Sequence, residues 1–199
     1  MPITVIDNGT SNEISIPEKI MAEQSATIIF EGNGNRVSIS ENTLLQGARL
    51  RLMTDCTFES GPNVRLAAIN VFAVLRGHVK IGAHTGMTWQ TSFFLHEPGE
   101  IVVGEGCLLA SGIELSVSDI HSIIDIETGL RINHAKDIVI GDRVWLAGGV
   151  HVLKGAKIGS ESIIGGGSYV TTHIPENCLA VGIPAKVIRT GVTWRQDLV

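Results

Sequence analysis

The chain has 199 residues, and a hydrophobic share of 44% with an aromatic share of only 5% requires a core of aliphatic side chains. Its 23 glycines add a pattern typical of short strands joined by tight turns. The formal net charge of −5 argues against a general nucleic-acid-binding protein. The sequence also shows neither a signal peptide nor an apolar run of membrane-spanning length.

The three cysteines, Cys56, Cys107 and Cys178, are far apart and form no C-x-x-C pair. An odd, scattered set argues against a disulfide framework and against a zinc site, and it favours a reducing compartment. We therefore expect a cytoplasmic protein without a metal site, folded as a single domain over residues 1–199.

The first stretch, residues 1–60, shows no sustained repeat, although NEISI at 12–16 is echoed by NRVSI at 35–39. Residues 65–180 do repeat, because a large apolar residue returns every six positions in three runs. We interpret residues 1–60 as irregular coils that cap this repeat, because the end of a repeating sheet exposes unpaired strand edges. The repeated positions are Ile69, Leu75, Ile81, Met87 and Phe93, then Val103, Leu109 and Leu115, then Ile140, Leu146, Val152, Ile158, Ile164 and Val170.

A period of six is a multiple of the two-residue period of a strand and does not match the 3.6-residue period of a helix. Each unit therefore fits one short strand and one turn, with the large apolar side chain pointing inward. Three units close a triangular coil, and stacked coils pair through parallel hydrogen bonds at roughly 4.8 Å. The repeat predicts an all-β parallel solenoid.

The repeat is interrupted from Asp119 to Asp137, close to the stretch SVSDIHSIID at 116–125. Inward residues pack the core, so a catalytic group has to lie on a corner or a loop, and His121 lies in this loop. A neutral imidazole can take a proton from an alcohol. Asp119 and Asp125 are candidates to orient the His121 ring, but an ordinary loop histidine would produce the same pattern.

Trp145 directly precedes the inward Leu146, so its side chain is expected to point outward from a strand. An outward tryptophan indicates a binding surface or a contact with another subunit. Beyond the repeat, residues 181–199 are expected to form a tail that packs on the outside of the fold or on a neighbouring subunit.

Four segments, SDIHSIID, KDIVIGDRVWLAGG, IIGGGSYVT and VGIPAKVIR, resemble the hexapeptide-repeat acyltransferases, and the resemblance covers about residues 65–190. It implies a left-handed parallel β-helix, which the usual right-handed rule for parallel crossovers does not predict. Within the family, the sequence is similar to bacterial capsular polysaccharide O-acetyltransferases, in particular those acting on polysialic acid. It also implies a homotrimer with active sites between subunits.

The resemblance implies direct transfer of an acetyl group from acetyl-CoA to a sugar hydroxyl. His121 would be the general base, and the Trp145 indole would bind the acetyl carbonyl or wall the thioester pocket. Thr172 stands where relatives often have Lys, and Lys186 where many have Arg, so the grip on phosphate is expected to be looser. The resemblance assigns coenzyme contacts to Gly148, Gly166, Thr171, Thr172, Lys186 and Arg189.

A sialylated polysaccharide is a polyanion, so a net-negative enzyme needs a local basic surface to bind it. The alternative acceptor is a small sugar or a nucleotide sugar. Gamma-type carbonic anhydrases share this architecture but need three converging imidazoles, and non-catalytic solenoids need no histidine loop. The basic candidates for the acceptor surface are Arg76, His78, Lys80, Arg131, His134, Lys136 and Arg143.

Overall fold

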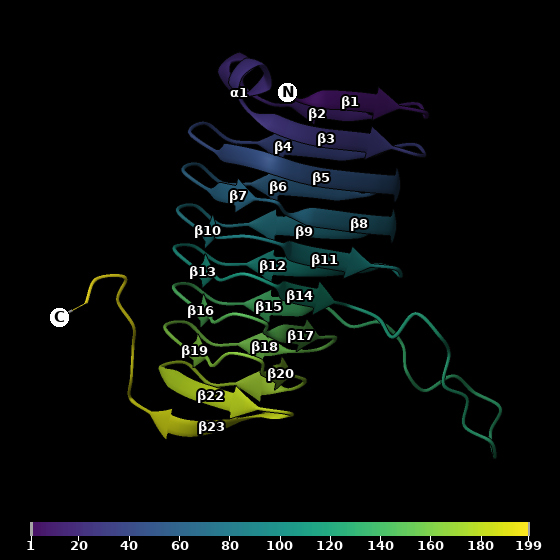
Figure 1. Ribbon diagram of the computed structural model, residues 1–199. Helices are drawn as coiled ribbons and strands as arrows, with labels where there is room; N and C mark the ends of the chain where they lie inside the picture. Colours follow the sequence, from purple (N-terminus) through teal and green to yellow (C-terminus); the bar gives the residue numbers. More distant parts are fainter. Residues whose placement is uncertain (1, 199) are drawn as a thin grey trace.

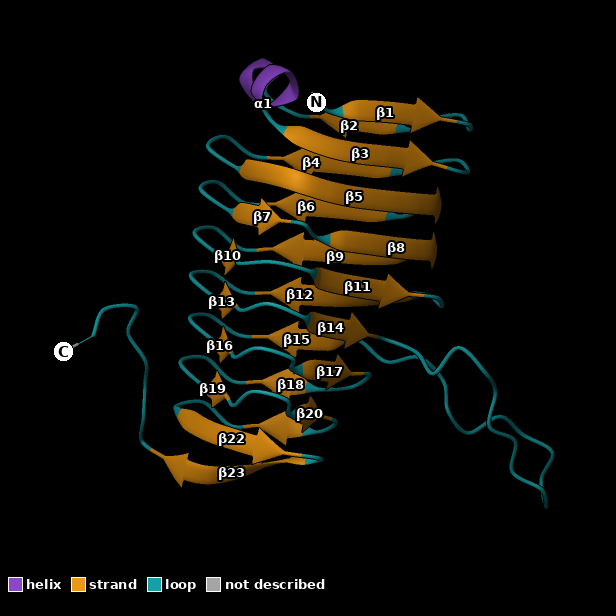
Figure 2. Cartoon of the chain, in the orientation of Figure 1, coloured by secondary structure: helices purple, strands orange, loops and turns teal. Residues whose placement is uncertain are grey.

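In the computed structural model, which describes residues 2–198, the chain winds into a prism of stacked coils with 23 strands and one helix among those residues (Figures 1 and 2). The strands form three faces, and all pair in parallel except the last. The first face contains β1 (Thr4–Asp7), β3 (Ser25–Phe30), β5 (Leu44–Thr54), β8 (Asn70–Leu75), β11 (Thr91–Leu95), β14 (Ile113–Ser116), β17 (His151–Leu153) and β20 (Tyr169–Val170).

The second face is a separate sheet, and the third face joins the first through the long strand β5, whose two ends pair on different faces. The second face contains β2 (Glu13–Ser15), β4 (Arg36–Ile39), β6 (Thr57–Ser60), β9 (Gly77–Ile81), β12 (Gly99–Val103), β15 (Ile138–Ile140), β18 (Lys157–Ile158) and β21 (His173–Ile174). The third face contains β7 (Arg65–Ala67), β10 (Gly86–Met87), β13 (Leu108–Leu109), β16 (Trp145–Leu146), β19 (Ile163–Ile164), β22 (Cys178–Gly182) and β23 (Ala185–Thr190).

Coil length explains why the repeat was visible in only part of the sequence. Val139 pairs with Lys157, 18 positions later, which is three units of six. Nearer the N-terminus the coils are longer, since Gly86 pairs with Leu108 and Thr4 with Thr27. The expected N-terminal cap is thus irregular in coil length, while its strands continue the parallel stack.

Helix α1 (Glu18–Glu23) covers the N-terminal end of the stack (Figure 1). Its own Ile20 side chain is buried in the core. The helix has six residues. Nowhere in residues 2–198 is there a helix with the length and apolar character needed to cross a membrane.

The predicted inward residues lie in the core, with one correction. Every repeated position is buried except Leu75, whose exposed fraction is 37%, so its placement in the core was wrong. Strand alternation points Val71 and Ala73 inward on β8, and Leu75 lies at the strand end, where a longer coil turns. Cys56, Cys107 and Cys178 are free thiols buried in the core.

The C-terminal residues close the other end of the prism and then fold back along it. β22 and β23 form an antiparallel hairpin, and residues 191–198 turn back beside the third face (Figure 1). Trp194 anchors this segment: it is 7% exposed, and its indole Nε1 donates a hydrogen bond of 2.6 Å to the Arg143 carbonyl. The sequence predicted that this segment packs either on the outside of the fold or on a neighbouring subunit. In the structure it packs on the outside of its own fold.

Candidate active site

The break in the repeat forms a long loop between β14 and β15 that projects from the prism (Figures 1 and 2). We call residues 117–137 the excursion. His121 lies in it and is exposed. Several apolar side chains of the excursion are also exposed, and Ile126 reaches an exposed fraction of 98%. The prism of the same chain therefore leaves this apolar surface uncovered.

Ion pairs join the base of the excursion to the neighbouring coils. Glu97, which follows β11, accepts two hydrogen bonds of 2.6 Å from the Arg131 guanidinium and one from the Ser118 hydroxyl. Lys154, which follows β17, pairs with the Asp119 carboxylate. Because β11 and β17 flank β14 in the sheet, the excursion is held on both sides.

Asn133 joins the two arms of the excursion beside His121. Its buried amide donates bonds of 2.8 Å to the His121 carbonyl and to the Asp119 carboxylate. Its side-chain oxygen accepts a bond of 2.7 Å from the Ile123 amide. The Asn133 side chain thus fixes the backbone on both sides of residue 122. It thereby fixes the direction in which the His121 side chain leaves the backbone.

The backbone next to His121 is strained. Ile120 has a φ of +67°, in the left-handed region that a β-branched residue rarely adopts. The Ser118 hydroxyl supports this turn by accepting a bond of 2.9 Å from the Ile120 amide. Eleven other non-glycine residues in residues 2–198 have a positive φ, so the angle alone does not mark a functional site; Ile120 is the β-branched residue among them.

Neither candidate aspartate orients the His121 ring within one chain. Asp119 is engaged by Lys154 and Asn133, and Asp125 accepts bonds from the amide and hydroxyl of Thr128. Among residues 2–198, no side chain forms a hydrogen bond with the ring. The ring is therefore open to a substrate or to a group from another copy.

We expect acid to weaken the pair between Glu97 and Arg131. The Arg131 guanidinium and then the Ser118 hydroxyl lower the pKa of Glu97 from 4.5 to about 2. A carboxyl with a lowered folded-state pKa contributes stability above its unfolded pKa, and this contribution is lost as pH falls. The melting temperature of Glu97→Gln should therefore be lower than the parent's at pH 7, and the difference should shrink below pH 4.5 and vanish near pH 2.

The control for this measurement is Glu13→Gln, which breaks an exposed pair with Arg36. Exposed ion pairs contribute little to stability, so this variant should melt with the parent at each pH. A difference between Glu97→Gln and the parent that does not change between pH 7 and pH 2 would contradict the prediction.

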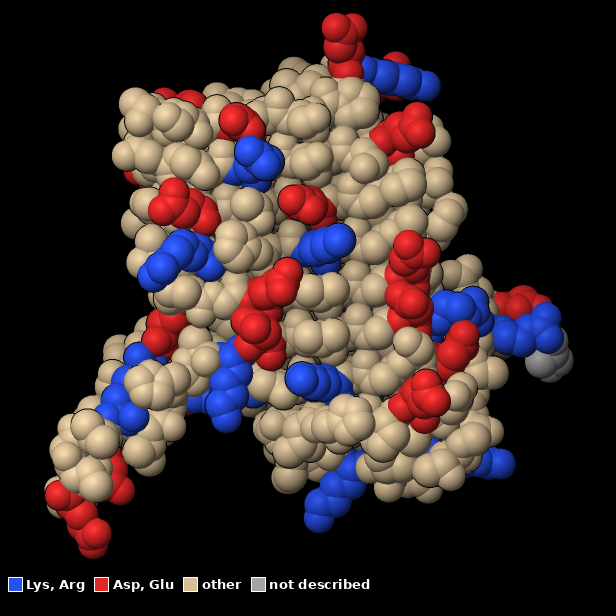
Figure 3. Space-filling view, turned by 180° about the vertical axis from the view of Figure 1, so that it is seen from behind, with Lys and Arg blue, Asp and Glu red and all other residues tan. Residues whose placement is uncertain are grey.

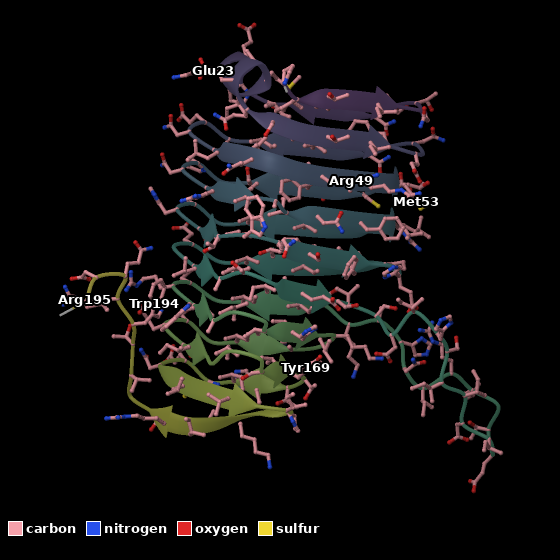
Figure 4. All side chains as sticks on the ribbon, viewed as in Figure 1. Glu23, Arg49, Met53, Tyr169, Trp194 and Arg195 are labelled. Carbon is pink, nitrogen blue, oxygen red and sulfur yellow. The ribbon has the colours of Figure 1, made fainter. Side chains whose placement is uncertain are left out.

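Trp145 points outward from β16, as predicted, and is half-buried by the C-terminal segment. Its ring centroid lies 6.1 Å from that of Trp194. Glu161 ties the same region together by accepting bonds from the Thr193 hydroxyl and the Arg143 guanidinium, and these bonds lower its pKa. Figure 4 shows Trp194 on this side of the prism.

The residues assigned to the coenzyme are all exposed, but they lie in three places. Gly148 and Gly166 are stacked at one corner, where the Gly148 carbonyl accepts a bond of 2.9 Å from Gly167. A Cβ on Gly148 would have only ordinary contacts, so the fold does not require glycine there. The other positions are Thr171 and Thr172 at the next corner, beyond β20, and Lys186 and Arg189 on β23.

A single chain does not bring His121 and Trp145 together. The excursion leaves the prism after β14, whereas β16 faces the C-terminal segment on another side (Figure 1). Gly148, by contrast, follows Trp145 in the same coil. Within one chain, Trp145 therefore lies near predicted coenzyme contacts, and the predicted base lies elsewhere.

The charged surface differs from the expected basic stretch. Arg131 is paired with Glu97 and Arg143 with Glu161, so two of the predicted cations are already neutralised. His78 shares a hydrogen bond of 2.9 Å with the Thr57 hydroxyl. The face in Figure 3 shows acidic and basic side chains interspersed rather than a continuous basic surface.

Burial argues against a covalent cysteine intermediate. The Cys107 thiol lies in the core, and burial raises its pKa to about 11, so the reactive thiolate is scarce at neutral pH. In residues 2–198, no three His, Cys, Asp or Glu side chains are arranged to hold a metal ion.

Comparison with known proteins identifies the family. Residues 137–172 match the family described as bacterial transferase hexapeptide (six repeats). A polysialic acid O-acetyltransferase of Neisseria meningitidis is 32% identical over 157 residues, which cover 75% of this chain and 69% of the relative.

Two solved structures match almost the whole chain. The polysialic acid O-acetyltransferase OatWY superposes with a TM-score of 0.89 at 28% identity, over 98% of this chain and 93% of that one. The polySia-specific acetyltransferase NeuO gives a TM-score of 0.86 at 29% identity, over 98% and 90%. The chain therefore belongs to the hexapeptide-repeat O-acetyltransferases, which fold as left-handed parallel β-helices.

Proposed function

We propose that this enzyme transfers an acetyl group from acetyl-CoA to a hydroxyl of a sialic-acid-containing polysaccharide. The observation that carries this proposal is the match of 98% of the chain to two acetyltransferases that act on polysialic acid. A match over 98% of the chain extends well beyond the repeat itself. We also propose a cytoplasmic location, where the three buried thiols stay reduced.

His121 acts as the general base in this proposal. Its imidazole takes the proton of the sugar hydroxyl while that oxygen attacks the thioester carbonyl. The new carbon–oxygen bond forms, the carbon–sulfur bond breaks, and the imidazolium returns the proton to the leaving thiolate. Among the backbone amides of residues 147–149, those of Ala147 and Gly149 already donate to the Ile164 and Ser111 carbonyls, so the Gly148 amide is the candidate to stabilise the negative charge on the carbonyl oxygen.

The active site is completed between copies of the chain, in a homotrimer. Two observations support this arrangement: one chain holds His121 and Trp145 on different sides, and its excursion carries apolar side chains that the same prism leaves uncovered. A second copy would cover them. Those that are half or more exposed are Ile120, Ile123, Ile124, Ile126, Leu130 and Ile132.

The donor lies along the exposed glycine corner and reaches the closing hairpin. Gly148 and Gly166 leave the backbone open to a thin ligand, since the fold does not need glycine at Gly148. Trp145, three residues before Gly148 in the same coil, walls the thioester end or binds its carbonyl. Thr171, Thr172, Lys186 and Arg189 contact the remainder of the coenzyme, with the two cations near its phosphates.

The test is an acetyl-transfer screen of the purified protein with acetyl-CoA and a panel of acceptors. The panel contains polysialic acid oligomers, neutral capsule oligosaccharides, free sugars and nucleotide sugars. Transfer to the sialic acid oligomers with the highest kcat/KM is the expected result. Preferential transfer to a free sugar or a nucleotide sugar would overturn the proposed acceptor.

A further inference from the structure

A cavity of about 520 Å³ lies beside Trp145, between the third face and the C-terminal segment. Outward residues of β7, β10, β13 and β16 form its floor, and its outer wall consists of Trp194, Arg195, Gln196 and Leu198. Cavities of this size are typical of small-molecule sites. Its lining contains two arginines and no carboxylate.

A glycine opens the floor of this cavity. On the third face, register aligns Arg65, Gly86, Leu108, Trp145, Ile163 and Leu179 in one outward row. Gly86 is the member of that row without a side chain. A Cβ there would have only the Leu108 side chain within reach, at 4.0 Å, and its φ lies outside the left-handed region. The fold therefore does not require this glycine.

Glycine within a strand weakens the strand, and it often marks a place where a ligand approaches the backbone. At position 86 its effect is a notch between the long side chains of Arg65 and Leu108. Gly86 forms part of the cavity floor, so the notch deepens the cavity at this point. The added space can accept a ring of the size of a sugar.

Arg65 supplies the charge at this notch. It is exposed, and no carboxylate in residues 2–198 pairs with it, whereas the other arginine of the cavity, Arg195, is held by Asp197 at 2.7 Å. A guanidinium binds a carboxylate through two parallel hydrogen bonds. Thr88 adds a hydroxyl, and the Trp145 ring adds a flat apolar surface against which a sugar ring can pack.

The cavity lies on the acceptor side of the proposed reaction centre. The residues proposed for the donor lie in the coil of Trp145 or in later coils, toward the C-terminal hairpin. Arg65, Gly86 and Leu108 lie in earlier coils, on the opposite side of Trp145. A donor that ends at Trp145 therefore leaves this cavity for the second substrate.

We infer that this cavity is the acceptor subsite, in which Arg65 binds the carboxylate of an acidic sugar over the notch at Gly86. The inference rests on the proposed function and assigns residues to the acceptor. It predicts that discrimination between acidic and neutral sugars is located in β7, at the start of the repeat and far in sequence from His121.

The first test is Arg65→Gln, assayed with polysialic acid oligomers and with a neutral oligosaccharide of similar length. We expect the KM for the acidic acceptor to rise about tenfold or more, as for loss of a charged hydrogen bond. The KM for the neutral acceptor and the Kd of acetyl-CoA should stay at the parent's values, and Arg65→Lys should restore part of the loss. Arg49→Gln, an exposed arginine of the first face, is the matched control and should behave like the parent (Figure 4).

The second test is Gly86→Leu, which fills the notch without straining the backbone. We expect loss of transfer to the acidic acceptor while acetyl-CoA binding and oligomeric state stay as in the parent. Parent-like transfer would overturn the inference. A changed oligomeric state would also overturn it, because a second copy would then occupy the cavity.

Failure of the inference and failure of the proposed function give different results. If the parent binds acetyl-CoA but transfers to no sialylated acceptor, the proposed function fails. If the parent transfers and Arg65→Gln keeps its KM, only the subsite inference fails.

Discussion

His121→Ala should lose about 100- to 10,000-fold in kcat, the range that a positioned general base contributes. The side chain is exposed on the excursion, so its removal should leave the melting temperature unchanged. Binding of acetyl-CoA should also be unchanged, because the proposed donor contacts are elsewhere. The measurement is initial rate of acetyl transfer at saturating donor, with donor binding followed by calorimetry.

The matched control is His134→Ala, a second exposed histidine of the same excursion. It removes an imidazole from the same loop without touching the proposed base, so its kcat should equal the parent's. Equal rates for His121→Ala and the parent would remove His121 from the mechanism. A large loss in His134→Ala and none in His121→Ala would reassign the base.

Asn133→Ala should reduce kcat by about 100-fold, as expected when a catalytic group is misplaced by about an ångström. The buried amide holds the His121 carbonyl at 2.8 Å and the Ile123 amide at 2.7 Å, so its loss frees the backbone on both sides of residue 122. The KM for acetyl-CoA should not change. Hydrogen exchange should show faster exchange of the Ile123 amide while core strands keep their protection.

Asp125→Ala is the control for Asn133→Ala, because it also removes a hydrogen-bonded side chain from the excursion. Asp125 holds Thr128 and has no bond to the His121 turn, so this variant should keep the parent's kcat. Equal losses in both variants would show that any disturbance of the loop affects activity, and would remove the specific role of Asn133.

Much of the core could be predicted because its signal is local. In an 18-residue coil, the side chain that points inward returns at a fixed spacing, so Ile140, Leu146 and Val152 are recognisable from their neighbours. Where coils lengthen to 22 residues, the spacing fails, and Leu75 was assigned to the core although it lies at a strand end. Residues 1–60 appeared irregular for the same reason.

The excursion was visible as a loss of period, but its internal contacts were not. Glu97 and Arg131 are 34 positions apart, and Lys154 and Asp119 are 35 apart. No short-range pattern links such residues. Asp119 and Asp125 appeared equivalent beside His121, although one carboxylate binds Lys154 and the other closes a local turn.

The sequence by itself determined the solenoid, the interruption around His121 and the outward direction of Trp145, because each depends on spacing along the chain. Only the tertiary structure decided which side chains meet across coils. It placed Asn133 behind His121, kept Trp145 on a different side from the excursion, and opened a cavity between Arg65 and Trp145. The reason is physical: stacking brings together residues one coil apart, and the lengths of the coils, which differ along the chain, decide which residues those are.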